Sequence, residues 1–427
     1  MPRVFLPVMI CCLADWYEMI AYFYKTKIGY CFYLIQSHHQ LFYPVLMIEK
    51  GGTKKTAVAI LGCRGVPNHY GGFEELAEHL SLGLVSLGYA VYVYNMHNHP
   101  VRDKNWKGVH RLFCFDPEKT IGTPGQFIYD LNCINDSRDR GFDIIIQLGY
   151  TSSSIWHRRL PSGAKIITNM DGLEWKRQKY SKLARHFLKY AELLAVRNSD
   201  MLIADNPVIK DYLESTYGVT STYIPYGADN CLADACKNDT VIKLFIPAEN
   251  TEQELHRNRY CLLIARLQPD NHIEEIIQGA LLSGKQSPLV VVGNYQTRYG
   301  MKLYKKYASK NVLFAGGIFQ SNLLNHLRNN ASLYFHGHSA GGTNPSLLQA
   351  MATGVPICAH DNPFNRSVLG DDAYYFKTSS EIASVIHIRK HEAQVMKMTK
   401  NNIQKIKTLY SWRKIVHQYN EIIQNIH

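Results

Sequence analysis

Two glycine-rich stretches offer backbone amides that can hold anionic groups. The first, 61–74, reads LGCRGVPNHYGGFE, and Gly71 and Gly72 stand directly before a pattern typical of a helix. Glycine lets the backbone turn tightly and approach a ligand closely, and the free amides at a helix N-terminus favour phosphate. The spacing is neither GxGxxG nor the P-loop pattern. A tight turn without a ligand is therefore the alternative.

The second stretch, 339–356, reads SAGGTNPSLLQAMATGVP and is typical of a loop, a helix, a turn and a strand. Backbone amides of such a loop, at the start of a helix, can bind a diphosphate or hydroxyl groups. We expect ligand contacts here from the following residues: Gly341, Gly342, Thr343, Asn344 and Ser346. Arg266 follows an apolar run at 260–265, and its guanidinium would pair with phosphate oxygens. A surface salt bridge is the alternative for Arg266.

Short apolar runs and amphipathic stretches alternate along most of the chain, and the pattern restarts after a polar stretch at 230–243. A helix is predicted at 73–87, 273–282 and 412–426 by apolar residues at helical spacing. Buried strands are predicted at 56–61, 90–94, 144–148, 165–168, 201–204, 260–265, 289–292, 312–314, 332–335 and 355–358. This order favours two α/β halves with parallel sheets. Ligands of such sheets bind beyond the carboxyl ends of the strands, where the two glycine-rich loops and Arg266 fall.

Three stretches together resemble family 4 of the retaining glycosyltransferases: YGGFE at 70–74, NMDGLEWKR at 169–177 and GHSAGGTNPSLL at 337–348. The last two are similar to a rhamnosyltransferase-like subgroup of bacterial polysaccharide synthesis. The resemblance covers about residues 55–425. It implies the α/β GT-B fold, in which two Rossmann-like domains face each other across a cleft, and a nucleotide-diphospho-sugar donor. We expect an acceptor-binding domain at 54–235, a donor-binding domain at 236–410 and a C-terminal helix at 411–427.

The resemblance also implies roles for single residues, and this chain departs from some of them. Arg266 matches an arginine that binds the diphosphate and stabilises the leaving group, but the lysine expected five residues later is Asn271. The family carries two glutamates eight residues apart, of which the first contacts the sugar and the second the ribose. Gly341 and Gln349 stand at these positions. Gln349 would bind a ribose hydroxyl without charge assistance, or it is only a helix-surface residue.

Asp171 stands where many members of the family carry an active-site histidine. Its carboxylate would orient a sugar hydroxyl or stabilise oxocarbenium-like charge, or it is the N-cap of a helix. Glu174 is a second candidate for acceptor contacts, with a solvated face as the alternative. By the same resemblance no metal or cofactor is expected, and neither His97/His99 nor His336/His338 completes a metal-ligand set.

A basic amphipathic helix is predicted from Lys176 onward. Its expected apolar stripe is Tyr180, Leu183, Phe187, Ala191 and Leu194, and its expected basic stripe is Lys179, Lys182, Arg185 and Lys189. Such a helix suits an anionic cytoplasmic leaflet, and a core helix with one solvated face is the alternative. The net charge of +12 agrees with anionic partners. Nucleic acid is not expected, because no nucleic-acid-binding motif accompanies this charge.

The sequence also bears on the location of the protein. Ten cysteines are scattered without a CxxC pair, which favours reduced thiols and a cytoplasmic protein. The basic helix, the positive charge and the lipid-linked acceptors common in the family favour a peripheral position on the inner face of the membrane. The apolar run at 4–14 is too short to span a bilayer and lacks the features of a signal peptide. Residues 1–53 are therefore a monotopic anchor, an extra packing element or, as we favour, sequence upstream of a start near Met47.

These features together predict a retaining glycosyltransferase that uses a nucleotide sugar, with rhamnose as the first candidate, and a lipid-linked saccharide as acceptor. Two rivals remain open. A catalytically degenerate nucleotide-sugar-binding protein would explain the loss of both glutamates and the lysine. A GT-B nucleotide-sugar epimerase would need no acceptor. A Rossmann dehydrogenase is disfavoured, since neither half carries GxGxxG with an acidic residue about 20 positions later.

Overall fold

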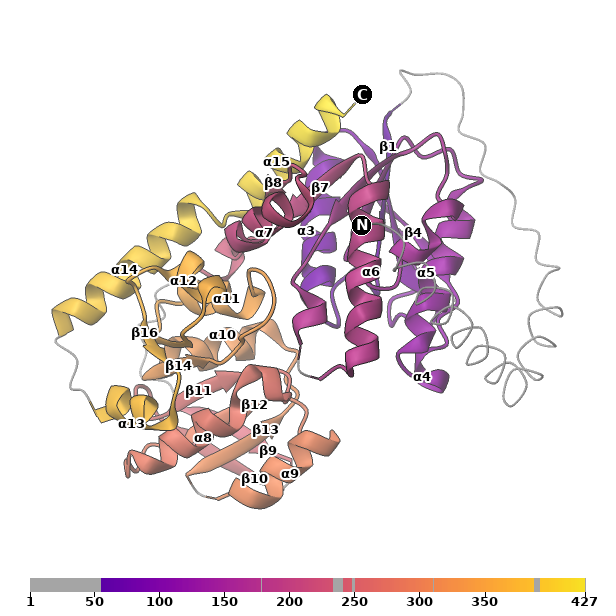
Figure 1. The fold of residues 1–427 in the computed structure, drawn as a ribbon. Coiled ribbons are helices and arrows are strands. Elements are labelled where there is room, and N and C mark those ends of the chain that lie inside the picture. The colour runs from indigo at the N-terminus through magenta and orange to yellow at the C-terminus, as the bar shows by residue number, and fades with distance from the viewer. Residues whose placement is uncertain are drawn as a thin grey trace, which may run out of the picture. The chain divides into compact units, whose positions relative to one another are not determined.

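The computed structural model describes residues 55–177, 179–232, 241–247, 250–309, 311–387 and 392–426 (Figure 1). The expectation for residues 1–53 lies outside them. Residues 55–427 form one compact unit. It contains an eight-stranded sheet in the first half of the chain and a six-stranded sheet in the second. The structure thus has two Rossmann-like α/β domains, as the sequence predicts.

The first sheet has the strand order β3-β4-β2-β1-β5-β6-β7-β8 and is parallel except for the β3–β4 pair. Val58 of β1 lies between Val91 of β2 and Ile144 of β5. The strands are β1 Ala57–Leu61, β2 Ala90–Met96, β3 Asn105–Trp106, β4 Val109–Cys114, β5 Ile144–Leu148, β6 Lys165–Asn169, β7 Met201–Ala204 and β8 Thr222–Tyr223. Every residue of β1 and β5 is buried, because helices cover both faces of the parallel sheet.

The helices of the first half follow its strands in the βα order. They are α3 Gly72–Ser86, α4 Glu118–Ile121, α5 Pro124–Ser137, α6 Lys182–Asn198 and α7 Pro207–Tyr217, with short 3₁₀ turns at Ser154–Arg159, Glu174–Lys176 and Asp229–Cys231. Leu76, Leu80 and Leu84 of α3 are buried, which confirms the predicted leucine stripe. Leu87 is half exposed and lies just beyond the helix.

The helix predicted from Lys176 is wrong at its start. The chain makes only a 3₁₀ turn at Glu174–Lys176, and α6 begins at Lys182, where the hydroxyl of Ser181 accepts the backbone N–H of Ala184. Its buried face is formed by Leu188, Ala191, Glu192 and Ala195. Leu183, expected in the apolar stripe, is 61% exposed. The N-cap at Ser181 fixes where the helix begins, and the predicted start at Lys176 ignored it.

The second sheet is entirely parallel, with the order β13-β12-β11-β14-β15-β16. Its strands are β11 Cys261–Ile264, β12 Leu289–Val292, β13 Val312–Gly316, β14 Leu333–His336, β15 Ile357–His360 and β16 Tyr374–Phe376. An antiparallel pair, β9 Ile242–Ile246 and β10 Thr251–Leu255, precedes it and was not predicted. The helices are α8 Ile273–Leu282, α9 Arg298–Tyr307, α10 Ser321–Asn330, α11 Pro345–Ala352, α12 Pro363–Leu369, α13 Ser379–His387 and α14 Glu392–Thr408, with a 3₁₀ turn at Pro269–Asn271.

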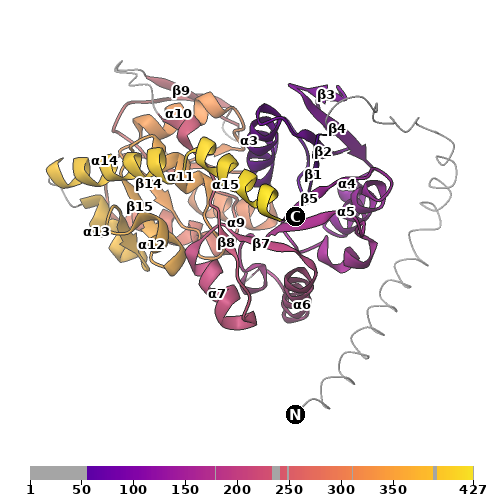
Figure 2. The same cartoon turned by 90° about the horizontal axis from the view of Figure 1, so that it is seen from above.

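The last helix, α15 (Trp412–Asn425), returns to the first half and packs on α3 (Figure 2). A Cβ atom at Gly83 of α3 would lie 2.5 Å from Val416, so only glycine allows this approach. Tyr89 donates its hydroxyl hydrogen to Asn420 at 2.7 Å. Where the chain crosses between the halves, Ala228 donates its backbone N–H to the carbonyl of Tyr410 at 2.8 Å. The C-terminal helix therefore belongs structurally to the first half.

Candidate functional site

The loop after β11 presents Arg266 to solvent at the carboxyl end of the second sheet. Its side chain makes no ion pair with any residue that the structure describes, so a surface salt bridge does not explain Arg266 among these residues. Asn271 is 3% exposed and donates Nδ2–H to the carbonyl oxygen of Arg266 at 2.7 Å. The side chain of Asn271 therefore holds the Arg266 loop in place from within. Its direct contact with a donor stays a prediction.

The second glycine-rich loop, 337–344, joins β14 to α11 and is held by its own polar side chains. Asn344 caps α11, since its Oδ1 accepts the backbone N–H of Ser346 at 2.9 Å. The hydroxyls of Ser346 and Tyr334 lie 2.7 Å apart. Gly341 has a φ of 128°, which disfavours any other residue there. Asn344 and Ser346 thus shape the loop, and their predicted donor contacts are not tested by these bonds.

Residues of the first half lie directly against this loop. A Cβ atom at Gly172 would fall 2.3 Å from Cα of Gly341, and one at Gly342 would fall 1.8 Å from Oδ1 of Asp205. The backbone N–H of Thr343 donates to Oδ2 of Asp205 at 3.2 Å. The two halves therefore touch backbone to backbone where the donor is expected. The glycines predicted for ligand contacts are also required for this close approach.

Asp171 and Glu174 lie on the loop after β6, but their surroundings differ. Asp171 has a φ of 49° and caps no helix, so the N-cap alternative is wrong. Glu174 is 8% exposed, and its Oε1 lies 2.5 Å from Nε of Arg177, so the solvated-face alternative is wrong as well. The terminal nitrogen Nη2 of Arg177 lies 3.6 Å from where a Cβ at Gly341 would stand. Glu174 thereby aims the guanidinium of Arg177 at the second glycine-rich loop.

The charged groups of this region change the pKa values of their neighbours. Burial raises the pKa of Asp171 to about 6, the charge of Glu174 adds to the rise, and the charges of Arg177 and Arg266 oppose it. Burial also raises the pKa of Asp205 well above its usual range, and Asp171 raises it further. Asp205 therefore holds a proton more tightly than an exposed aspartate does, and Asp171 changes charge near pH 6.

A neutral imidazole lies beside the same arginines. Burial lowers the pKa of His338 well below its usual range, and the charges of His336, Arg177 and Arg266 lower it further. The rings of His336 and His338 stack with their centroids 4.5 Å apart. Within the described ranges, no group of three or more His, Cys, Asp or Glu side chains is arranged as metal ligands would be.

Two helix N-termini face each other at the site. Helix α3 begins at Gly72 with Gly71 as its N-cap residue, and no side chain caps it. A Cβ at Gly72 would lie 3.0 Å from Cγ of Pro345, the first residue of α11. The positive ends of both helix dipoles are thus directed to one place, which favours an anion.

Gln349 of α11 is a bridging residue, not a helix-surface residue. Its Nε2 donates to both carboxylate oxygens of Glu75, at 3.1 and 3.0 Å, and its Oε1 accepts Nη2–H of Arg328 at 2.6 Å. Glu75 belongs to α3 of the first half. The position expected to bind ribose therefore lies at a contact between the halves.

Behind Asp171 and Glu174, the buried Glu192 of α6 fixes their loop. It is 1% exposed and accepts hydrogen bonds from Trp175 Nε1 at 3.0 Å and from Lys189 Nζ at 2.9 Å. The hydroxyls of Tyr212 and Tyr217 each donate to it at 2.6 Å. Because Trp175 follows Glu174 directly, the hydrogen bond from Trp175 to Glu192 fixes the position of this loop relative to α6.

Three residues of this region were missed by the sequence analysis: Glu75, Arg177 and Asp205. Asp205 directly follows the predicted strand at 201–204, so its place at a strand end was a usable signal. Arg177 stands three residues after Glu174, a spacing that allows an ion pair. Nothing local distinguishes Glu75 from the other acidic residues of α3.

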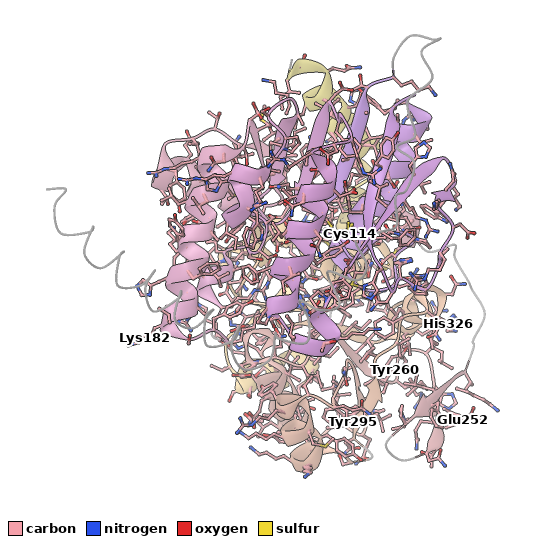
Figure 3. All side chains as sticks on the ribbon, turned by 90° about the vertical axis from the view of Figure 1, so that its right-hand side faces the viewer. Cys114, Lys182, Glu252, Tyr260, Tyr295 and His326 are labelled. Atoms are coloured by element: carbon pink, nitrogen blue, oxygen red, sulfur yellow. The ribbon has the colours of Figure 1, made fainter. Side chains whose placement is uncertain are left out.

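The predicted basic helix shows a mixed surface. Lys182, labelled in Figure 3 at the start of α6, is exposed, and so are Leu183, His186 and Tyr190. The amino group of Lys189 is instead engaged by Glu192. No helix among the described residues is both long and apolar enough to span a bilayer.

Each half of the chain matches a different family model. Residues 248–406 match the family model "Glycosyl transferases group 1", and residues 55–229 match "Domain of unknown function (DUF1972)". No curated protein sequence is similar enough to count as a match.

Solved structures extend the comparison to the whole fold. Sucrose-phosphate synthase from Thermosynechococcus elongatus is 16% identical with a TM-score of 0.68, covering 87% of this chain and 99% of that one. HepE from Anabaena, in complex with UDP-glucose, is 13% identical with a TM-score of 0.63, covering 86% and 99%. A glycosyltransferase from Rickettsia africae is 12% identical with a TM-score of 0.61, covering 88% and 99%. Residues 248–406 are therefore similar to the glycosyl transferases group 1 domain, and the chain has the GT-B fold.

Proposed function

We propose that the protein is a retaining glycosyltransferase that moves a hexose or deoxyhexose from a nucleotide-diphospho-sugar to a lipid-linked saccharide. Rhamnose is the first candidate sugar, and capsule, O-antigen or exopolysaccharide synthesis is the expected context. The group 1 domain supports transfer of a sugar. The Anabaena protein, whose structure holds UDP-glucose, supports a nucleotide-sugar donor.

One observation carries the proposal: Arg177 and two helix N-termini lie at the second glycine-rich loop, and Arg266 acts on the same group of charges. Arg177 lies beside Gly341, and Arg266 is close enough to lower the pKa of Asp171. The N-termini of α3 and α11 abut at Gly72 and Pro345. This arrangement suits a diphosphate, whose charge grows as the bond to the sugar breaks.

In the proposed reaction, an acceptor hydroxyl forms a bond to the anomeric carbon while the bond from this carbon to the phosphate oxygen breaks. The departing phosphate oxygen takes the hydroxyl proton on the same face of the sugar, so the configuration is retained. Arg266 and Arg177 stabilise the departing charge, and the ionised Asp171 stabilises positive charge on the sugar ring. Contact between the halves excludes water, which limits hydrolysis of the donor.

The surface of α6 supports the proposed location at a membrane. The exposed Lys182, Leu183, His186 and Tyr190 on α6 suit an anionic leaflet, because they combine positive charge with apolar groups. We therefore place the protein in the cytoplasm, peripheral on the inner face of the membrane that carries the lipid-linked acceptor.

The test is transfer by the purified full chain from a panel of nucleotide sugars to a short lipid-linked saccharide. Released nucleoside diphosphate and the mass of the acceptor report turnover, and the anomeric configuration of the product by NMR reports retention. We expect acceptor-dependent release from one donor and its loss in Arg266→Ala. Arg298→Ala, an exposed arginine on α9, is the matched control and should keep full activity. An inverted product would refute the retaining mechanism.

A catalytically degenerate, donor-binding protein is the second candidate. It is favoured by Asn271, which replaces a cation and whose side-chain amide is already bonded to the Arg266 carbonyl. Donor binding by calorimetry without turnover on any acceptor of the panel would support it. Any acceptor-dependent turnover that Arg266→Ala abolishes would exclude it.

A further inference from the structure

A carboxylate stands beside position 349, although residue 349 itself is an amide. Both oxygens of Glu75 accept hydrogen bonds from Nε2 of Gln349, at 3.1 and 3.0 Å. On the other side, Oε1 of Gln349 accepts from Arg328 at 2.6 Å. The amide is oriented by these partners, since only its oxygen can face the cation and only its nitrogen can face the carboxylate. The first half thus supplies the negative charge that the second half lacks here.

The place of this carboxylate fits a particular part of a nucleotide. Helices α3 and α11 abut at their N-termini, at Gly72 and Pro345. Glu75 and Gln349 lie about one turn further along their helices, or ~5 Å beyond the N-termini. A nucleoside diphosphate with its phosphates at the two N-termini has its ribose next in the molecule. The hydroxyls of that ribose would then lie beside Glu75.

We infer that Glu75 recognises the ribose 3′-hydroxyl of the nucleoside diphosphate, across the contact between the halves. This inference rests on the proposed function and names the residue that binds the ribose. An ionised carboxylate has about four acceptor positions. Gln349 occupies one on each oxygen, and the side chain of Asn230 also donates to this carboxylate. About one acceptor position therefore remains for a hydroxyl group.

The neighbours of Glu75 act on its pKa in opposite directions. Burial raises the pKa of Glu75 and the charge of Glu78 adds to the rise, whereas the hydrogen bond from Gln349 and the charge of Arg328 oppose it. Hydrogen bonds to an ionised acceptor are stronger than neutral ones. Because Glu75 and Gln349 belong to different halves, a ribose held by Glu75 also joins the halves when the donor binds.

The competing explanation is a purely structural tie, in which Glu75 only holds Gln349. Stability alone cannot separate the two, since both predict that removing the carboxylate loosens the contact. Discrimination between a ligand with the 3′-hydroxyl and one without it does separate them. A structural tie lowers affinity for both ligands equally, whereas a ribose contact changes the ratio of the two affinities.

The experiment is calorimetry on the full chain with UDP, dTDP, GDP and ADP, followed by the 3′-deoxy counterpart of the tightest ligand. We expect the unmodified protein to bind the 3′-deoxy ligand about tenfold more weakly. Glu75→Gln keeps the shape of the side chain but should bring the two affinities within about twofold. The double variant Glu75→Gln/Gln349→Glu returns a carboxylate to the pair and should regain the preference. Glu214→Gln, an exposed glutamate of α7, is the control and should change neither affinity.

Each outcome has a distinct meaning. A Glu75→Gln variant that keeps the full preference for the 3′-hydroxyl ligand over the 3′-deoxy ligand would overturn the inference and leave the proposed function intact. An unmodified protein that binds a diphosphate but does not distinguish these two ligands would have the same meaning. A folded protein that binds none of the four diphosphates would overturn the proposed function and, with it, the inference. Gln349→Glu alone should bind more weakly, because it sets two carboxylates against each other.

Discussion

Replacing Asp171 by asparagine should raise the stability of the protein while lowering its activity. Burial raises the pKa of this carboxyl from 3.8 to about 6. The folded state therefore binds the proton more tightly than the unfolded state does. Stability from this group is complete below about pH 4, falls as the pH rises, and is fully lost above about pH 6. A shift of about two units corresponds to about 3 kcal/mol.

Asparagine cannot ionise, so Asp171→Asn should avoid this loss at neutral pH. Asp171 has a φ of 49°, a left-handed conformation that asparagine also accepts, so the backbone adds no penalty. Since the side chain keeps some contact with solvent, we expect a gain of about 1–3 kcal/mol at pH 7.5 and none at pH 4. The thermal midpoint, measured by calorimetry at both pH values, should rise only at pH 7.5.

The activity should change in the opposite direction. With the proposed donor and acceptor, kcat/KM of the unmodified protein should fall about tenfold per pH unit below pH 6. Asp171→Asn should have a lower plateau and no such fall. Asp211→Asn, an exposed residue of α7, is the control and should leave both measurements unchanged. Equal midpoints for Asp171→Asn and the unmodified protein at pH 7.5, or an unchanged acid limb, would refute the assigned environment of Asp171.

Three further predictions test the contacts around the site and the core. Gly342→Ala places a methyl group 1.8 Å from the position of the Asp205 carboxylate oxygen, so kcat/KM should fall at least tenfold. Gly163→Ala, which faces open space, is the control and should have no effect, and full activity in Gly342→Ala would contradict the close contact. Burial raises the pKa of Asp130 to about 7, so its stabilising effect is present below about pH 4 and is lost as the pH rises through 7. Asp130→Asn should flatten the pH dependence of the free energy of urea unfolding between these pH values, and an unchanged dependence would argue against a buried carboxyl. Glu192→Gln replaces one oxygen of a buried carboxylate that five donors share, so the free energy of unfolding in urea should fall by about 2–4 kcal/mol. A loss below about 1 kcal/mol would mean that the donors find other partners.

Local patterns predicted the elements that position the site. The run at 56–61 is apolar and β-branched, and it forms β1 at Ala57–Leu61; the leucines of 73–87 form the buried face of α3. Each of these patterns is formed by residues close together in the sequence, so it can be recognised without knowing the fold. The start of α6 was wrong because the cap at Ser181 was not considered. The β9–β10 pair was missed because β9 alternates between buried and exposed residues and β10 is polar and largely exposed, so neither resembles the continuous apolar runs of the buried strands.

The contacts between the halves could not be predicted in the same way. Glu75 and Gln349 are 274 positions apart, and Asp205 and Thr343 are 138 apart. No periodicity links residues at such distances, and their proximity depends on how two finished sheets pack. The resemblance indicated that Gln349 and Gly341 stand at a donor site. Only the structure places Glu75 and Asp205, carboxylates of the first half, against the same loop and helix.

The return of α15 to the first half has a consequence for synthesis of the chain. The second half, from β9 to α14, is inserted between β8 and the last helix of the first half. Domains generally fold as they leave the ribosome, N-terminal first. Here the first half emerges early but lacks the helix that covers Gly83 of α3 until Val416 has been made. The nascent first half therefore exposes an apolar face of α3 throughout translation of the second half, and chaperones have that interval in which to bind it.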